Sequence, residues 1–180
     1  MRKTLALLLL LLPAPAPAFA APSEEDKLFS QLAKAESSEE AQAIEQKLGG
    51  LFKVSGSPTV DLLMSRATTA LAGADHKSAR KLLDAVTQVA PQYAEGWRQR
   101  ALLQAAAGDD AGAMVSLQKA VELNPRHFNA LSELGTMLEE YGDKPGALKL
   151  FRRVISLDPQ MSGAARHEKA LEKEVEGQGI

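Results

Sequence analysis

The chain has 180 residues, a formal net charge of −2 and no cysteine. A mildly acidic composition lacks the basic excess that nonspecific binding to nucleic acid or anionic lipid requires. The absence of cysteine excludes disulfides and a lipid-modified N-terminal cysteine, and it is compatible with export to an oxidising compartment.

Residues 1–21 have the pattern of a secretory signal peptide. The second and third residues are basic, Leu5–Leu12 is an unbroken apolar run, and Ala18-Phe19-Ala20 supplies small residues for cleavage before Ala21. The apolar run is too short to span a bilayer, so a retained membrane anchor is the less favoured alternative. A leucine-rich signal ahead of a helical domain is typical of bacterial export, and we therefore expect a periplasmic protein.

Residues 22–57 are expected to form a degenerate helical hairpin followed by a linker. Two groups of apolar residues have helical spacing, namely Leu28, Phe29 and Leu32, and then Ala41, Ile44, Leu48 and Phe52. Gly49-Gly50 either ends or bends the second helix, and Ser57 is placed to cap the next helix with Pro58 in its first turn. We expect this hairpin to cover the apolar end of the first unit of the repeat that follows.

A repeat occupies residues 58–161. Pro91, Pro125 and Pro159 are 34 residues apart, which divides the segment into units 60–93, 94–127 and 128–161. A period of this length is the signature of a stack of helical hairpins, because each proline ends a helix pair that cannot continue through it.

Other residues recur in register with the prolines, and each type has a physical reason. Small residues allow close helix approach, bulky residues fill the adjacent space, and aspartates at the inter-helix turn cap the second helix. The small residues are Ala67, Ala101 and Gly135, then Ala79, Ala113 and Ala147. The bulky residues are Leu83, Leu117 and Phe151, and the aspartates are Asp75, Asp109 and Asp143.

These landmarks resemble the tetratricopeptide repeat (TPR) family over about 60–159. The match rests on Trp97, Ala101, Ala113, Ala120 and Pro125 in the second unit, and on Leu134, Gly135, Ala147, Phe151 and Pro159 in the third. The resemblance implies an all-α, TPR-type α-solenoid of antiparallel helix pairs. Arg66 and Arg100 stand where the family often has leucine, and we expect their stems to pack between repeats with the guanidinium groups paired to carboxylates.

Residues 162–180 are alanine-rich and then densely charged. Terminal repeats need a polar outer face, so this segment is expected to form a capping helix with a short tail.

No catalytic constellation is visible in the sequence. His76, His127 and His167 lie in different units without metal-ligand spacing, and there is neither a phosphate-binding glycine loop nor a nucleophile elbow. We expect a protein that is not an enzyme and has no cofactor or metal, with His127 acting as a packing or turn residue.

The resemblance implies that the first helix of each unit lines a concave groove, which is the candidate partner-binding surface. The groove residues are Asp61, Met64, Thr68 and Leu71 from the first unit, Glu95, Arg98, Leu102 and Ala105 from the second, and Asn129, Ser132, Thr136, Glu139 and Glu140 from the third. The lysine and asparagine clamp by which some family members hold a C-terminal carboxylate is absent. A peptide with basic and apolar residues would complement this groove better.

The leading hypothesis is a protein–protein interaction module or scaffold in the bacterial periplasm, which binds a peptide or helix of an envelope protein. The partner is a protein or peptide, with no nucleic acid and no stable membrane insertion after signal cleavage. One alternative is self-association into a homo-oligomer, through the convex face or through a terminal helix that is not fully covered. Phe29 and Phe52 would form the apolar contact if the N-terminal hairpin does not fold back. Another is a non-catalytic accessory subunit of an envelope enzyme or secretion complex.

Overall fold

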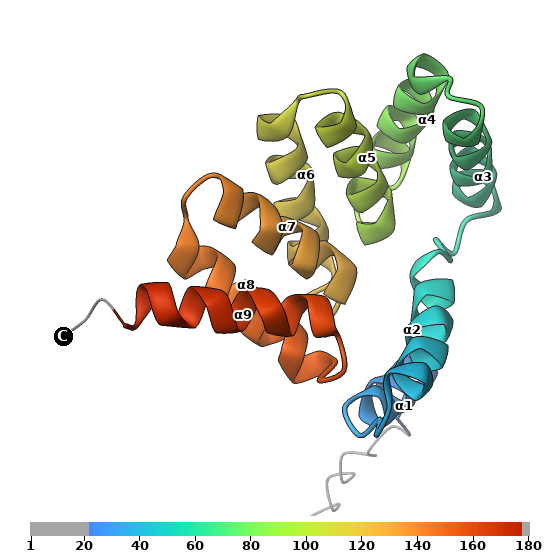
Figure 1. The fold of residues 1–180 in the computed structure, drawn as a ribbon. Helices are drawn as coiled ribbons and strands as arrows, with labels where there is room; N and C mark the ends of the chain where they lie inside the picture. Colours follow the sequence, from blue (N-terminus) through green and yellow to red (C-terminus); the bar gives the residue numbers. More distant parts are fainter. Residues whose placement is uncertain (1–21, 178–180) are drawn as a thin grey trace, which may run out of the picture.

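The computed structural model describes residues 22–177, which form nine α-helices and no strand (Figure 1). The helices are α1 (Glu24–Leu32), α2 (Ser38–Phe52), α3 (Pro58–Ala72), α4 (His76–Val89), α5 (Ala94–Ala106), α6 (Asp110–Leu123), α7 (Phe128–Glu140), α8 (Lys144–Leu157) and α9 (Ser162–Val175). The expectation of an all-α fold of helix pairs is confirmed. The predicted signal peptide lies outside the described residues. Within those residues, no helix has both the length and the apolar character that crossing a membrane requires.

The turn aspartates cap the second helix of each pair. The carboxylates of Asp75, Asp109 and Asp143 each accept a hydrogen bond of 3.0 Å from a backbone N–H three residues later. Such a cap satisfies an N–H group that has no partner within the helix and places negative charge at the positive end of the helix dipole. The periodic aspartates therefore set where α4, α6 and α8 begin.

The residue before each aspartate has a left-handed backbone, with φ of 76° at Gly108 and 87° at Gly142. Ala74 has φ of 56° at the same position of the first pair and is the one non-glycine residue with positive φ in the described range. All three turns close with the same hydrogen bond, from the aspartate N–H to a carbonyl five residues back, at 2.8–2.9 Å. The first turn therefore adopts the glycine geometry without glycine.

Small residues bring the paired helices together. Ala79, Ala113 and Ala147 are fully buried where α4, α6 and α8 begin their contact with the preceding helix. Gly135 on α7 faces the ring of Phe151 on α8, and a Cβ added there would lie 3.1 Å from the ring. Steric size at these few positions sets the spacing of the helices.

The two unusual arginines behave differently. Arg100 donates to Asp84 at 2.8 Å and to the hydroxyl of Ser116 at 3.0 Å, which ties α5 to the helices on either side. This contact confirms the expected inter-repeat role for Arg100. Arg66 is exposed on α3, because no earlier helix pair packs against that side, so the same expectation is wrong for Arg66.

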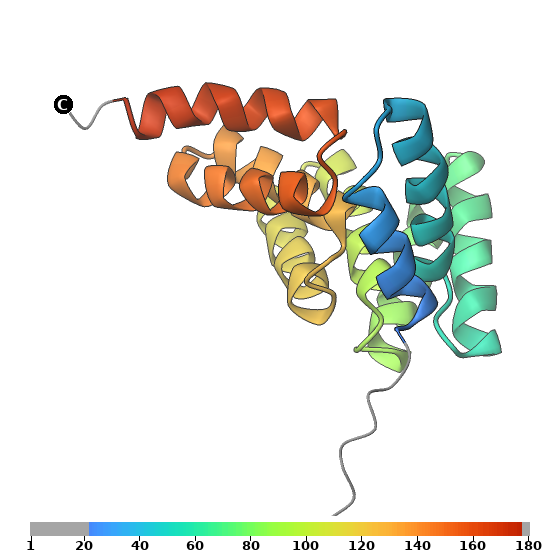
Figure 2. The same ribbon diagram turned by 90° about the horizontal axis from the view of Figure 1, so that it is seen from below.

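The N-terminal hairpin does not cover the first repeat, and that part of the sequence-based expectation is wrong. The buried cluster that contains Phe29 and Phe52 also contains Phe128, Phe151 and Leu171 from α7, α8 and α9, but no residue of α3 or α4. Figure 2, which views the molecule from below, shows α1 and α2 in front of the ends of the repeat helices. The apolar face of the hairpin is thus buried in a cluster with the third repeat and α9.

The hairpin runs along what we call the loop edge, formed by the connections α4–α5, α6–α7 and α8–α9. Tyr93 donates from its hydroxyl to the Lys53 carbonyl at 2.8 Å. The ring of His127, one repeat later in the same register, lies 4.4 Å from that of Phe52. In the last connection the Gln160 amide donates to the Ala35 carbonyl at 3.0 Å. Three successive connections therefore contact one hairpin.

Candidate partner-binding groove

The first helices of the pairs, α3, α5 and α7, enclose two hollows that are open to solvent. The α3–α5 hollow has a volume of about 200 Å³, and the α5–α7 hollow has a volume of about 220 Å³. Together they make up what we call the groove, and α5 contributes to both. The predicted groove residues are distributed between these hollows, the wall that separates them, and positions outside both.

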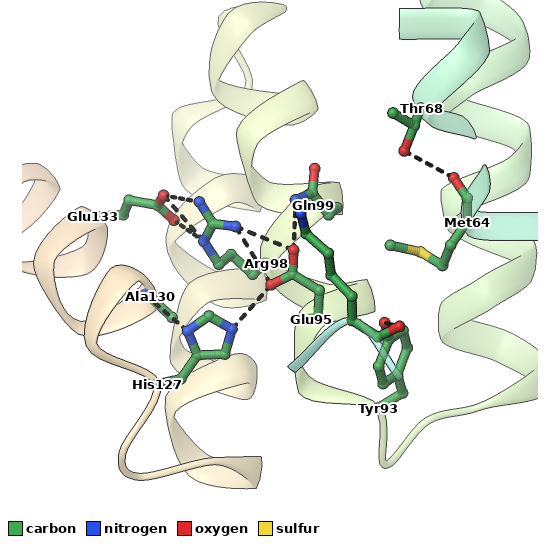
Figure 3. A network of polar contacts seen from close by, with 10 residues as sticks. Met64, Thr68, Tyr93, Glu95, Arg98, Gln99, His127, Ala130 and Glu133 are labelled. Carbon is green, nitrogen blue, oxygen red and sulfur yellow. Dashed lines mark hydrogen bonds and ion pairs between the residues drawn. The ribbon is translucent and has the colours of Figure 1, made fainter. Parts of the chain in front are cut away.

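Most of the residues that line the α3–α5 hollow carry polar groups. Four of the predicted residues line it, namely Asp61, Met64, Thr68 and Glu95. The carboxylate of Asp61 accepts hydrogen bonds from the N–H and hydroxyl of Ser55, and these bonds hold the pKa of Asp61 below its ordinary value. Thr68 donates to the carbonyl of Met64 within α3 at 3.0 Å, as Figure 3 shows. Met64 is the one wholly apolar residue of this lining.

The α5–α7 hollow is almost entirely apolar. Its lining consists of Ala101, Leu102, Ala105, Leu117, Glu133, Thr136 and Met137. Leu102 is 39% exposed, although leucine is a residue that usually contributes to the core. An open, leucine-lined hollow is suited to receive an apolar side chain from another chain.

A chain of ionic contacts separates the two hollows (Figure 3). The guanidinium group of Arg98 on α5 binds both oxygens of Glu133 on α7, with N–O distances of 2.5–3.1 Å, and it contacts Glu95 at 3.2 Å. Glu95 is only 3% exposed, and it also accepts hydrogen bonds from Gln99 at 2.6 Å and from His127 at 2.9 Å. The wall between the hollows is therefore a satisfied polar network that joins the second and third repeats.

His127 has both ring nitrogens occupied. The backbone N–H of Ala130 donates to Nδ1 at 3.4 Å, which caps the start of α7, and Nε2 lies 2.9 Å from the Glu95 carboxylate. Because Nδ1 accepts, the proton is assigned to Nε2, which donates to Glu95. The ring is 1% exposed, so His127 is a buried positioning residue for Glu95.

The two carboxyl groups of the network differ in their ionisation. Burial raises the pKa of Glu95, but the hydrogen bond from His127 and the charge of Arg98 outweigh it, and the pKa is lowered. Burial also raises the pKa of Glu133, and here the contacts with Arg98 do not compensate fully, so this pKa is raised. Arg98 contacts both carboxylates and binds Glu133 more closely, but Glu95 has two additional donors, His127 and Gln99, which stabilise its charged form.

The remaining predicted residues lie elsewhere. Leu71 packs against the buried cluster between α3 and α4, and Asn129 and Ser132 are half-buried on α7 outside both hollows. The carboxylate of Glu139 contacts His167 of α9 at 2.6 Å, so α9 already occupies it. Tyr93 lines the α3–α5 hollow and was not predicted. The sequence feature that could have identified Tyr93 is its position, which is equivalent to that of His127 in the next repeat.

Within residues 22–177, no cluster of three or more His, Asp or Glu side chains has an arrangement that could hold a metal ion. The ionisable groups of the wall, Glu95, Arg98, His127 and Glu133, are instead paired with one another.

Comparison with known proteins places the fold. Residues 116–162 match a family model described as a tetratricopeptide repeat. The Sgt2 TPR domain of Aspergillus fumigatus superimposes with a TM-score of 0.58 at 22% identity, covering 68% of this chain and 82% of that domain. The fold is that of a tetratricopeptide-repeat solenoid.

Two further similarities extend this comparison. The Yersinia enterocolitica type III secretion chaperone SycD, in complex with a peptide of the translocator YopD, superimposes on the TPR solenoid with a TM-score of 0.60. The identity is 14%, and the match covers 66% of this chain and 95% of SycD. A TPR repeat-containing protein of Rhizobium etli is 34% identical over 84 residues, which is 47% of this chain. The match spans 41% of the length of that relative.

Proposed function

We propose that this TPR solenoid is a non-catalytic protein-interaction module of the bacterial periplasm, whose groove binds a segment of an envelope protein. The observation that carries the proposal is the α5–α7 hollow, with its exposed Leu102. An apolar side chain of the partner enters this hollow, and the adjoining residues of the segment follow the groove past the Arg98–Glu133 wall. The compartment is inferred from the signal-peptide pattern of residues 1–21.

The charges around the groove indicate what flanks the apolar anchor. Asp61 lies in the α3–α5 hollow, and Glu140 is exposed at the end of α7. Carboxylates at the two ends favour lysine or arginine on either side of the anchor. The partner segment is therefore a short peptide or helix with a central apolar residue and basic flanks. The SycD structure supports peptide binding by such a solenoid, because SycD is in complex with a peptide of YopD.

The structure does not favour self-association of two copies through Phe29 and Phe52. Phe29 and Phe52, the residues expected to join two copies, are buried within one chain against Phe128. Their rings lie 6.4 Å and 5.8 Å from that of Phe128.

The groove is tested by photo-crosslinking in the native cell. A photoreactive residue replaces Met64 or Leu102, one in each hollow, and Val115 serves as the control because it is apolar, 61% exposed and on α6. One shared partner from both groove sites, with none from Val115, supports the proposal. Equal capture from Val115, or none from the groove sites, contradicts it, and adducts with the same chain indicate self-association.

A matched pair of substitutions then tests the anchor. Leu102→Asp should weaken binding of the captured partner at least about tenfold, because a charge enters the apolar hollow, whereas Val115→Asp should not change it. The compartment is tested separately by osmotic-shock release and by the mass of the exported chain, which should begin at Ala21.

A further inference from the structure

The connection between α8 and α9 holds a buried carboxylate that is only half satisfied. Asp158 is 0% exposed, and its Oδ1 accepts a hydrogen bond from the Gln160 N–H at 3.0 Å. Its Oδ2 is buried and has no hydrogen-bond partner. A buried, unpaired carboxylate oxygen is costly, so this atom requires an explanation.

The group that faces Asp158 is another carboxyl, that of Glu45 on α2 of the N-terminal hairpin. The two side chains are within hydrogen-bonding reach, and Asp158 is the one charged group that acts on Glu45. None of the ion pairs among residues 22–177 includes either side chain. The hydrogen bond by which the same connection holds the hairpin, from Gln160 to the Ala35 carbonyl, is neutral. Two carboxylates without a cation cannot both be ionised at low cost, so one proton between them supplies the missing hydrogen bond.

The ionisation of Glu45 agrees with this geometry. Burial, followed by the hydrogen bond and the charge of Asp158, raises the pKa of Glu45 to about 7 from its ordinary 4.5. A carboxyl group whose pKa is raised by docking favours the docked state below its ordinary pKa. That preference is lost as the pH rises from 4.5 toward about 7.

We propose that Glu45 and Asp158 form a proton-dependent latch that holds the N-terminal hairpin on the loop edge of the solenoid. With the proton in place, Glu45 donates to Asp158 and the hairpin is docked. When the proton leaves, two negative charges face each other between α2 and the α8–α9 connection, and the hairpin loosens.

The preceding repeat provides an internal comparison. Asn124 occupies the position equivalent to Asp158, and its side-chain oxygen accepts from the Arg126 N–H at 2.9 Å, as Asp158 does from Gln160. Asparagine therefore maintains this turn equally well. The second oxygen of Asp158 is not needed for the turn, and it is the atom available to share a proton with Glu45.

Hydrogen exchange of the exported chain tests the latch. Amide protection in α1 and α2, corrected for intrinsic exchange rates, is measured from about pH 5 to about pH 8, with α5 and α6 as the internal reference. Protection of the hairpin should fall at least roughly tenfold across this range while that of the reference does not.

Two substitutions replace the shared proton with a permanent donor. In Asp158→Asn the amide donates to Glu45, and in Glu45→Gln it donates to Asp158, so hairpin protection in either variant should no longer fall with pH. The control Glu39→Gln removes an exposed carboxylate of α2 and should behave as the wild type. The proposal is overturned if hairpin protection in the wild type does not change with pH. It is also overturned if protection falls with pH as in the wild type in both amide variants, or in either variant whose hairpin is still protected.

Discussion

Ala74 has a backbone conformation that the two later repeats assign to glycine. Its φ of 56° corresponds to 76° at Gly108 and 87° at Gly142. A residue with a Cβ pays about 1–2 kcal/mol in the left-handed region. Glycine would remove that cost but would lose about 0.4–1 kcal/mol through its larger unfolded-state entropy. Ala74→Gly should therefore stabilise the protein by about 0.5–1 kcal/mol, which raises the Tm by about 2 °C.

Urea denaturation of the exported chain, followed by circular dichroism, measures this difference. The reverse change, Gly142→Ala, is the matched control, because a Cβ there meets no atom within 4 Å and only the backbone conformation is perturbed. It should destabilise by about 0.5–1 kcal/mol. If Ala74→Gly is no more stable than the wild type while Gly142→Ala shows its loss, the assumed equivalence of the three turns is refuted.

Four further substitutions test the repeat and the groove wall. Asp143→Ala removes the cap on the first turn of α8 and should cost about 1 kcal/mol in the same assay. Gly96→Ala places a Cβ 2.7 Å from Val86 and should cost about 1–3 kcal/mol, whereas Gly163→Ala fills open space and should be neutral or slightly stabilising. Because the pKa of Glu95 is lowered, its stabilisation is present above 4.5 and lost as the pH falls; Glu95→Gln should flatten this acid-induced loss in pH-dependent thermal melts.

The periodic features could be predicted because they depend on short-range structure. Asp109 caps the helix that it begins, Gly108 needs only its own backbone freedom, and Ala113 is buried against the helix just before it. Each contact recurs with the repeat, so one sequence contains three instances of the same pattern. Local chemistry with a fixed period is therefore sufficient to predict the helix pairs and the small residues between them.

Contacts without a period could not be predicted. Arg126 pairs with Asp26 across 100 residues, and nothing in either local sequence indicates the other, so the hairpin was expected at the wrong end. Glu95 lines the α3–α5 hollow, as its helical position predicts, but its near-complete burial was not predicted. It is buried because His127, 32 residues later, reaches back to it. Burial at a repeat junction depends on the partner side chain as well as on helical phase.

The position of the hairpin also has a mechanical consequence. In a solenoid each unit contacts only its neighbours, so the stack can bend and twist between successive units. Here the docked hairpin contacts three successive connections, through Tyr93, His127 and Gln160. Contacts with the hairpin along one edge of the stack restrict its curvature, and the curvature of the stack sets the width of the groove. While the hairpin is docked, the protein should therefore present a groove of nearly constant width, which lowers the entropic cost of binding but restricts the range of segment shapes that fit.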